Sequence, residues 1–244
     1  RAGMADSMMT SSVGEAAISG VSLVDMIIML INAVFAAVAT GGAVIASQYL
    51  GHRDRKKACE ASSQLMVVTA VCALLFTVVS LAARKPLLSL LFGQIDADVM
   101  DAALTYLTVS ALSFPFLASF NSSSALFRAM NDSRTPTVVS LGMNVMNLIG
   151  NSILIFGMKW GVAGAAISTL LSRVMAAAVM FALSLNRERQ LYVRPDQMTR
   201  FQPTLIGQIL YIGIPSGIEN GIFELGRIVV VSMISTFGTV QIAA

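Results

Sequence analysis

Residues 62–83 of the chain read SSQLMVVTAVCALLFTVVSLAA and contain no charged side chain. At the α-helical rise of about 1.5 Å per residue, this stretch is long enough to cross the roughly 30 Å hydrocarbon core of a bilayer. Because an unsatisfied backbone N–H or C=O is costly in hydrocarbon, a segment of this length is expected to be a helix. The stretch therefore predicts a membrane-spanning α-helix, and the fold depends on how often such stretches recur.

Similar apolar stretches follow one another along the whole chain. Hydrophobic residues make up 56% of the 244 residues and charged residues only 12%, whereas a soluble domain carries about 25% charged residues. We expect helices near residues 1–13, 23–48, 62–83, 102–127, 136–157, 161–185 and 205–237. The predicted fold class is an all-α polytopic membrane protein, whose short loops favour an up-down bundle.

Basic residues are concentrated in alternate loops. Ten of them lie in residues 49–61, 128–135 and 186–204, whereas the loops of the opposite side contain Arg84, Lys85 and Lys159. Lys and Arg are in excess on the cytoplasmic side of membrane proteins, so we expect the three basic loops to be cytoplasmic and the protein to lie in the cell (inner) membrane. Anionic lipid headgroups, and not nucleic acid, are the expected partner of these loops.

The cysteine and histidine content argues against several kinds of site. Cys59 and Cys72 fit neither a disulfide scaffold nor a metal site, and His52 is the only histidine. The chain contains no Walker-type phosphate-binding loop. We therefore expect a protein that is not an enzyme, has no cofactor and is not driven by a nucleotide site within this stretch.

The two ends of the chain resemble each other in sequence. The stretch Met8–Gly14 is similar to Ser232–Gly238, and setting Gly14 on Gly238 also aligns Ile18 with Ile242. Repeated helix bundles are how many secondary transporters are built. We expect residues 1–200 to form an amino-terminal lobe, 201–244 to hold the first helix of a second lobe, and the chain to be a fragment that continues in both directions.

Proline and small residues predict local features of the spans. Pro115 and Pro215 lie inside predicted helices and are expected to kink them. Gly164 and Ser168 recur at four-residue spacing, which favours close packing of the helix at 161–185 against a neighbour. Arg173, near the middle of that helix, is expected to make an ion pair or carbonyl contacts.

Polar side chains at similar depth suggest a site. Counted along their helices, Asp6, Asn147, Asn151 and Thr169 lie roughly 9–15 Å below the outer ends. A carboxylate with amide and hydroxyl oxygens suits a small hard cation such as sodium. Alternatively, a desolvated carboxylate can exchange a proton. A third possibility is that Asp6 lies in a water-filled vestibule and the asparagines are interhelical hydrogen-bond pairs.

Three further polar residues are candidates for a cavity or for a site in the second lobe. Asn121 can line a cavity or bond across helices. Glu219 follows Pro215 by about one turn, where a bent helix often frames a site. Glu224 can instead pair with Arg227 along its own helix, which would neutralise both.

Ordered motifs carry a resemblance to a known family. They are ASQYLG at 46–51, FRAMNDSRTP at 127–136 and NLIGNSILIFG at 147–157, which runs into GVAGAA at 161–166. In this order and at this spacing they resemble the multidrug and toxic compound extrusion (MATE) transporters, over nearly the whole chain.

The resemblance implies a fold and a function. The fold is a twelve-helix, inverted-V antiporter of two six-helix lobes. The function is export of amphipathic, often cationic drugs or metabolites in exchange for protons or sodium, by a monomer. Two alternatives stay open, a flippase for lipid-linked saccharides of the same superfamily and a non-transporting membrane receptor.

The resemblance also implies roles for individual residues. Asp6 matches the acidic residue on the family's first helix, and Asn147 and Thr169 match polar members of its cation site. Asn151 stands where some members have aspartate, which removes a charge. Glu224 lies near a glutamate that some members use on the seventh helix.

Overall fold

A computed structural model of the chain describes residues 14–92 and 96–236. These residues are helical almost throughout, and no strand occurs among them. The helices, in chain order, are α2 (Glu15–Gly51), α3 (Arg55–Ala82), α4 (Arg84–Phe92), α5 (Ala97–Leu112), α6 (Phe114–Ala129), α7 (Arg134–Asn151), the π-helical η1 (Ser152–Gly157), α8 (Gly161–Ser184), α9 (Pro195–Met198) and α10 (Pro203–Thr236). The predicted all-α fold class is confirmed.

Length and hydropathy identify most of these helices as candidate membrane spans. Four stretches qualify alone: α2, α3, α7 together with η1, and α8; α5 and α6 form a fifth as a bent pair. Helix α10, at the predicted 205–237, is not among the candidates, and its described part carries Gln208, Glu219 and Asn220. The expected helix at 1–13, and with it most of the repeat between the chain ends, lies outside the described residues.

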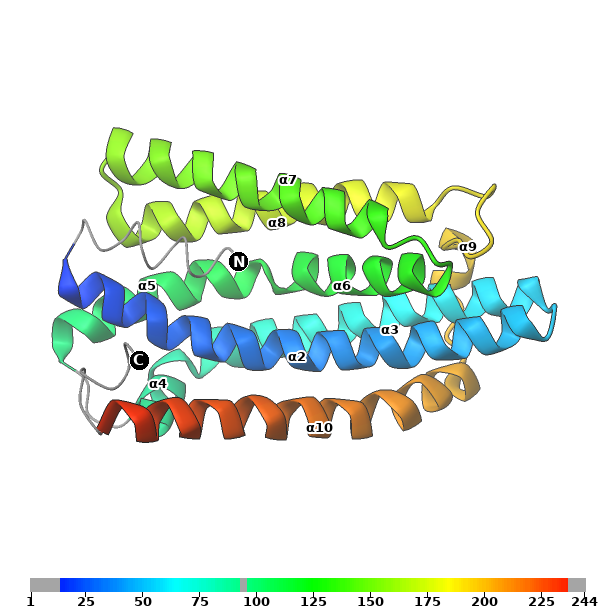
Figure 1. Ribbon diagram of the computed structural model, residues 1–244, viewed down its shortest axis with the longest axis horizontal. Helices are drawn as coiled ribbons and strands as arrows, with labels where there is room; N and C mark the ends of the chain where they lie inside the picture. The colour runs from blue at the N-terminus through cyan, green and yellow to red at the C-terminus, as the bar shows by residue number, and fades with distance from the viewer. Residues whose placement is uncertain (1–13, 93–95, 237–244) are drawn as a thin grey trace.

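Helix α2 lies at the centre of the bundle (Figure 1). It packs against α3, α5, α6 and α10, while α7 and α8 form an antiparallel pair that α5 and α6 join to the rest through α8. Two clusters of buried apolar side chains fill the bundle. Phe35 of α2 is central to one of them, in edge contact with Phe76 and Phe114. Ile45 and Leu65 belong to the other, near the end of the bundle that contains α9.

Glycine allows α2 and α10 to touch along their backbones. A Cβ on Gly41 would lie 2.6 Å from the carbonyl oxygen of Ile209, and one on Gly213 would lie 3.1 Å from Val38 Cα. Small residues of this kind let helices approach closely. Helix α10 continues through Pro215 as one element. Its contact with α2 at Gly213 lies two residues before this proline.

The span predicted at 102–127 is broken near its middle. Helices α5 and α6 are inclined by 50° at Ser113. Pro115 occupies the first turn of α6, where its missing N–H has no intrahelical partner to lose. The prediction of a kink at Pro115 is confirmed, and it takes the form of a helix end followed by a new helix start.

Two predicted loops are wrong in extent. Residues 49–61 are helical except for 52–54, because Asp54 accepts a hydrogen bond from Lys57 N at 3.1 Å and caps α3. The charged residues that follow continue the helix beyond its apolar stretch. On the opposite side, 84–101 contains the short helix α4. Hydropathy alone finds only the part of a helix that lies in hydrocarbon.

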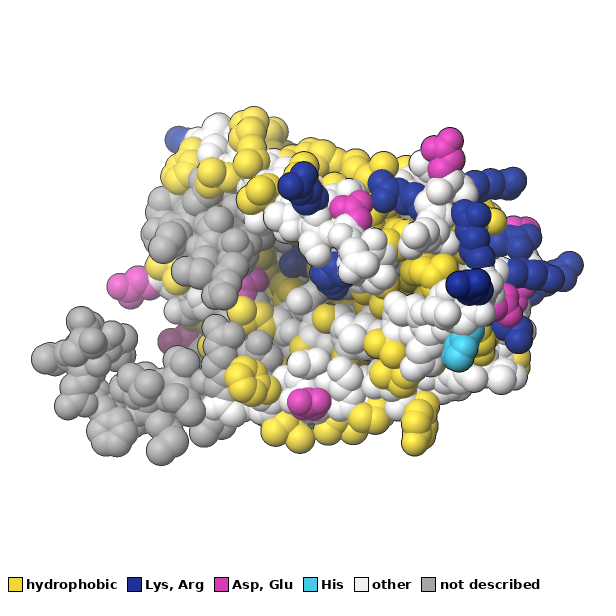
Figure 2. Space-filling model, turned by 45° about the vertical axis from the view of Figure 1, so that its right-hand side comes forward, with side chains coloured by type: hydrophobic (Ala, Val, Ile, Leu, Met, Phe, Trp, Pro, Cys, Tyr) yellow, Lys and Arg dark blue, Asp and Glu magenta, His cyan; other side chains and the backbone are white. Residues whose placement is uncertain are grey.

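Basic side chains gather at one end of the molecule (Figure 2). This end, called the basic end below, comprises the turn 52–54, the turn 130–133, the helix ends that flank both turns, and the segment 185–202, which joins α8 to α10; its basic residues are Arg53, Arg55, Lys56, Lys57, Arg128, Arg134, Arg187, Arg189, Arg194 and Arg200. The predicted grouping of the basic segments on one side is thus present in space.

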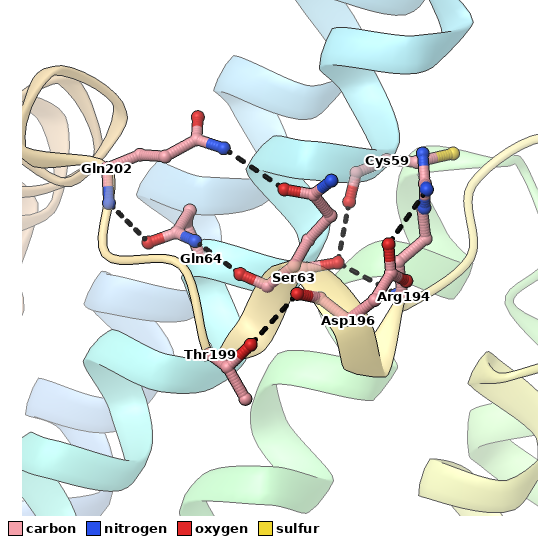
Figure 3. A network of polar contacts seen from close by, with 8 residues as sticks. Cys59, Ser63, Gln64, Arg194, Asp196, Thr199 and Gln202 are labelled. Atoms are coloured by element: carbon pink, nitrogen blue, oxygen red, sulfur yellow. Dashed lines mark hydrogen bonds and ion pairs between the residues drawn. The ribbon is translucent and has the colours of Figure 1, made fainter.

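The segment 185–202 is packed onto α3 through several hydrogen bonds. Figure 3 shows Gln64, which is fully buried, pointing from α3 into this segment. Its Nε2 donates to the carbonyl oxygens of Gln197 and Arg200 at 2.9 and 2.7 Å, and its Oε1 accepts from Gln202 N at 3.3 Å. The residue before it, Ser63, accepts through Oγ from Arg194 N at 2.8 Å. The prediction of 186–204 as a polar loop missed α9 and this docking.

A second anchor joins the same segment to the turn between α6 and α7. Arg189 pairs with Asp132 at 3.1 Å and stacks 4.4 Å from the ring centroid of Phe127. Asp132 also accepts from the backbone N–H and the hydroxyl of Thr135 at 3.1 and 2.7 Å. These hydrogen bonds, that of the Thr135 N–H first, and the charge of Arg189 lower the pKa of Asp132 below its ordinary value.

The first prediction concerns Gln64. Replacing it with leucine leaves two backbone carbonyls and one N–H without their partner; the Gln197 carbonyl is buried and the other two groups are partly buried, and such a loss costs about 1–3 kcal/mol for a fully buried group. We expect Gln64→Leu to lower the thermal unfolding midpoint of the purified protein in detergent. Gln48→Leu makes the same change at an exposed position of α2 and serves as the control. Equal midpoints for the two variants would contradict the anchoring role.

The second prediction is a pH dependence. Because the pKa of Asp132 is lowered in the folded protein, its carboxylate stabilises the fold above the ordinary aspartate pKa of about 3.9, and this stabilisation is lost as pH falls through the lowered value. Asp132→Asn should therefore unfold at a lower temperature than wild type at pH 7. The difference should shrink below about pH 4. If the difference in unfolding temperature between wild type and Asp132→Asn stays constant from pH 7 to pH 3, the stabilising role of the Asp132 carboxylate is contradicted.

Candidate functional site

A buried polar cluster lies between α7 and α8. Asn147 Nδ2 donates to Thr169 Oγ1 at 2.9 Å, and Asn151 Nδ2 lies 3.5 Å from Asn147 Oδ1. Both asparagines are fully buried, and Thr169 is 2% exposed. Residues four apart on a helix share a face, which places Asn147 and Asn151 one above the other against α8. The structure thus brings together three residues singled out by depth.

Close backbone contact holds this cluster in place. A Cβ on Gly150 would lie 2.4 Å from Ser168 Oγ, and Ser168 donates to the carbonyl oxygen of Asn147 at 2.9 Å. One turn earlier on α8, a Cβ on Gly164 would lie 3.1 Å from the backbone of Leu154. The predicted close packing through Gly164 and Ser168 is confirmed. The glycines therefore set the distance across which Asn147 reaches Thr169.

The backbone changes its winding directly after Asn151. The π-helical turn η1 begins at Ser152, and Met158 N bonds to Ile153 O at 2.9 Å. Single π-helical turns inside α-helices occur frequently at functional sites. The cluster therefore lies at the junction of regular and widened helix, where carbonyl groups are displaced from the α-helical ladder.

The described side chains of the cluster are neutral. Amide and hydroxyl oxygens are ligands that hard cations accept, but neither group gains or loses a proton near neutral pH. Among the residues with described positions, no group of three or more His, Cys, Asp or Glu side chains could hold a metal ion. The cluster can coordinate or hydrogen-bond, and an ionisable partner is needed for proton exchange.

The other predicted site residues lie elsewhere or are not described. Asp6 falls outside the described residues, and so does the side chain of Glu224. Asn121 of α6 donates to Asn32 Oδ1 of α2 at 2.9 Å, so it bonds across helices. Glu219 is exposed on α10 and lines a groove of about 860 Å³ with Pro215 and neighbouring residues. No described contact joins Glu219 to the cluster.

Sequence reasoning missed one carboxylate within a span. Asp25 of α2 accepts a hydrogen bond from the hydroxyl of Tyr106 on α5 at 3.3 Å, and Tyr106 is fully buried. The signal was available, because Asp25 interrupts the apolar run 23–48 about 15 Å from the start of α2. Intramembrane carboxylates are functional candidates by default.

Arg173 makes a specific contact at the helix break. Its Nη1 donates to Ser113 Oγ at 2.7 Å, and Ser113 donates in turn to the carbonyl oxygen of Ser110 at 2.6 Å. Arg173 is one turn from Thr169 on α8, so the cluster and the break between α5 and α6 lie along the same helix face.

The fold and the buried polar cluster define a multi-pass, all-α membrane protein with an intramembrane polar site. The MatE family model matches residues 2–153. The chain therefore belongs to the MATE family, as its motifs predicted.

Individual relatives agree with this family. The chain is 31% identical over 240 residues to the uncharacterized transporter YisQ of Bacillus subtilis, covering 97% of this chain and 52% of that protein. It is 29% identical over 238 residues to the probable multidrug resistance protein NorM of Thermotoga maritima, covering 92% and 48%. The chain thus spans about half the length of the curated relatives it matches.

Solved structures show the same fold. An inward-facing multidrug resistance MATE family transporter of the MOP superfamily superposes with a TM-score of 0.84 at 20% identity, covering 92% of this chain and 50% of that one. A MATE transporter in the bent conformation gives 0.80 at 21% identity, covering 88% and 48%. Since about half of each solved chain is matched, the superpositions fit one lobe and the helix that follows it.

The third prediction tests the packing that holds the cluster. Gly150→Ala places a methyl group against Ser168 and forces its hydroxyl away from the Asn147 carbonyl. Gly142→Ala, on the same helix, meets nothing within 4 Å and should stabilise the helix by up to about 1 kcal/mol. We expect thermal unfolding in detergent to move in opposite directions for the two variants. A higher midpoint for Gly150→Ala would show that the approach is not tight.

Proposed function

We propose that the chain is the amino-terminal lobe, with the first helix of the second lobe, of a secondary active antiporter. The complete transporter exports amphipathic, often cationic drugs or metabolites in exchange for protons or sodium. It is a monomer in the cell (inner) membrane, with residues 49–61, 128–135 and 186–204 on the cytoplasmic side. It uses no cofactor besides the coupling ion.

The observation that carries this proposal is the buried cluster of Asn147, Asn151 and Thr169. Polar groups are expensive in hydrocarbon and are rarely kept there without a function. In a chain of the MATE family, the cluster occupies the position that the resemblance assigns to a cation site, and Asp6 would supply its negative charge. Multidrug export is also what the name of one relative states, the multidrug export protein MepA of Staphylococcus haemolyticus, which is 26% identical over 227 residues.

We expect the mechanism to be alternating access, in which ion binding and substrate binding favour different conformations of the helix bundle. Entry of the ion at the cluster repositions the first helix and closes the space in which the substrate lies, so that the substrate leaves on the outer side. The coupling requires that ion and substrate each bind the two conformations with different affinity. The contact of Gly41 with Gly213 packs α2 closely against α10, because small residues let the two backbones approach.

The fourth prediction uses everted membrane vesicles that contain the complete transporter. An imposed proton gradient, and separately a sodium gradient, should drive movement of an ethidium-type dye. Asn147→Ala should reduce this movement at least tenfold, since the cluster loses its central amide, and Asp6→Asn should abolish it. Asn144→Ala is the control, because Asn144 lies one turn away on α7 and makes no described side-chain hydrogen bond.

The outcomes separate the alternatives. Dye movement driven by one gradient, lost in Asn147→Ala and kept in Asn144→Ala, supports the proposal and identifies the ion. If neither gradient moves dye in wild type, multidrug export is refuted and the flippase for lipid-linked saccharides becomes the leading alternative.

A further inference from the structure

Asp25 lies within the apolar interior of the lobe. It is surrounded along α2 by Val21, Val24 and Ile28, all buried in the cluster that includes Phe35. Its own side chain is half-buried. A charged carboxylate is costly within a membrane span. The presence of Asp25 there therefore indicates a specific hydrogen-bond partner and a functional role.

The partner on α5 is held at a tight helix crossing. A Cβ on Gly20 would lie 2.9 Å from Ala102 Cβ and from Ala103 N, so α2 and α5 nearly touch there. One turn further along each helix, the hydroxyl of Tyr106 donates to Asp25 Oδ1 at 3.3 Å. The crossing therefore determines the distance between the carboxylate and the phenol.

A polar seam leads from this pair to the asparagine cluster. Tyr106 and Ser110 of α5 and Ser113, which caps α5 at the break, are fully buried and follow one another at helical spacing. Ser113 accepts from Arg173, which is one turn from Thr169. The hydroxyl of Ser110 is buried and has no hydrogen-bond partner among the described residues, and a buried polar group of this kind normally has one.

The charged groups on the helices around α2 are few. On α5 they are Asp98 and Asp101, near its exposed start, besides the phenol of Tyr106; α8 contributes Arg173, α6 ends at Arg128, and α3 begins with Arg55, Lys56, Lys57 and Glu60. On α10 the described side chains include exposed Glu219, and Glu224 and Arg227 follow in sequence. Glu15 opens α2 itself. Within the described first-lobe spans, Asp25 is thus the carboxylate farthest from either helix end.

We propose that Asp25 is a second proton-carrying group of the lobe, on a different helix from Asp6, with Tyr106 positioning its carboxylate. In one conformation the carboxylate takes a proton from water on one side, forming an O–H bond. In the other conformation that bond breaks and the proton passes to water on the opposite side, while Tyr106 keeps its own proton. The proposal deepens the proposed function and rests on it for the direction of transport.

The fifth prediction tests protonation without transport. Infrared difference spectra of the complete purified transporter, recorded between acidic and alkaline pH, should contain the C=O band of a protonated carboxyl group. Asp25→Asn should remove the part of this band that Asp25 contributes, leaving that of Asp6, and Asp101→Asn, at an exposed position on α5, should keep the Asp25 part. Identical spectra for wild type and Asp25→Asn would overturn the proposal, whatever the transport result.

Transport provides the second readout. In vesicles with a proton gradient, Asp25→Asn should lower ethidium movement at least tenfold, Asp25→Glu should restore part of it with a displaced pH profile, and Tyr106→Phe should displace the profile. A wild-type rate and pH profile in Asp25→Asn would overturn the proposal. If the wild type moves no dye, and the infrared contribution of Asp25 is present in the wild type but absent from Asp25→Asn, proton binding by Asp25 is supported and the proposed export fails.

Discussion

Every polar group inside the spans needs a partner in the protein, because lipid offers none, and this constraint organises the lobe. Asn121 on α6 bonds to Asn32 on α2, Ser122 bonds to Thr69 on α3, and Arg173 bonds to Ser113 at the break. Each pair joins two helices at a defined register. Apolar contacts alone hardly favour one register between two helices over another, since lipid tails are as apolar as the helix surfaces. The polar pairs therefore specify which helices meet, and the glycines specify how closely.

The same logic extends beyond the membrane at the basic end. There, Gln64 satisfies backbone groups of the segment 185–202 that would otherwise be buried without partners, and Arg189 ties that segment to Asp132. The segment is consequently packed onto α3 up to about Gln202, where α10 follows at once. In the proposed two-lobe transporter, freedom between the lobes then resides in α10 or beyond it, and Pro215, close to the Gly213 contact, removes a backbone hydrogen bond at that level.

The spans and much of the site could be predicted from the sequence, because each depends on a local rule. Hydrocarbon thickness sets the length of 62–83, and the short connection at 158–160 forces α7 and α8 to be antiparallel, which brings Thr169 level with Asn147. What could not be predicted depends on tertiary contact. The docking of 185–202 depends on one buried glutamine, and the continuation of α3 back to Arg55 is invisible to hydropathy. Asp25 was missed because one charged residue hardly lowers the mean hydropathy of an apolar run as long as 23–48, although the residue itself is visible in the sequence.

The polar seam bears on how such a lobe couples an ion to motion. A neutral cluster of amides and hydroxyls can bind a cation but cannot change its own charge, whereas a carboxylate against a buried phenol can. Buried residues of the seam lie between the two kinds of group, and Arg173 of α8 reaches the break at Ser113, where α5 and α6 meet at 50°. A change in charge at one end would alter the field felt by Arg173, whose guanidinium lies at that break. Under the protonation proposed for Asp25 and the ion binding proposed between α7 and α8, the bent helix pair is the element that lies between the two sites.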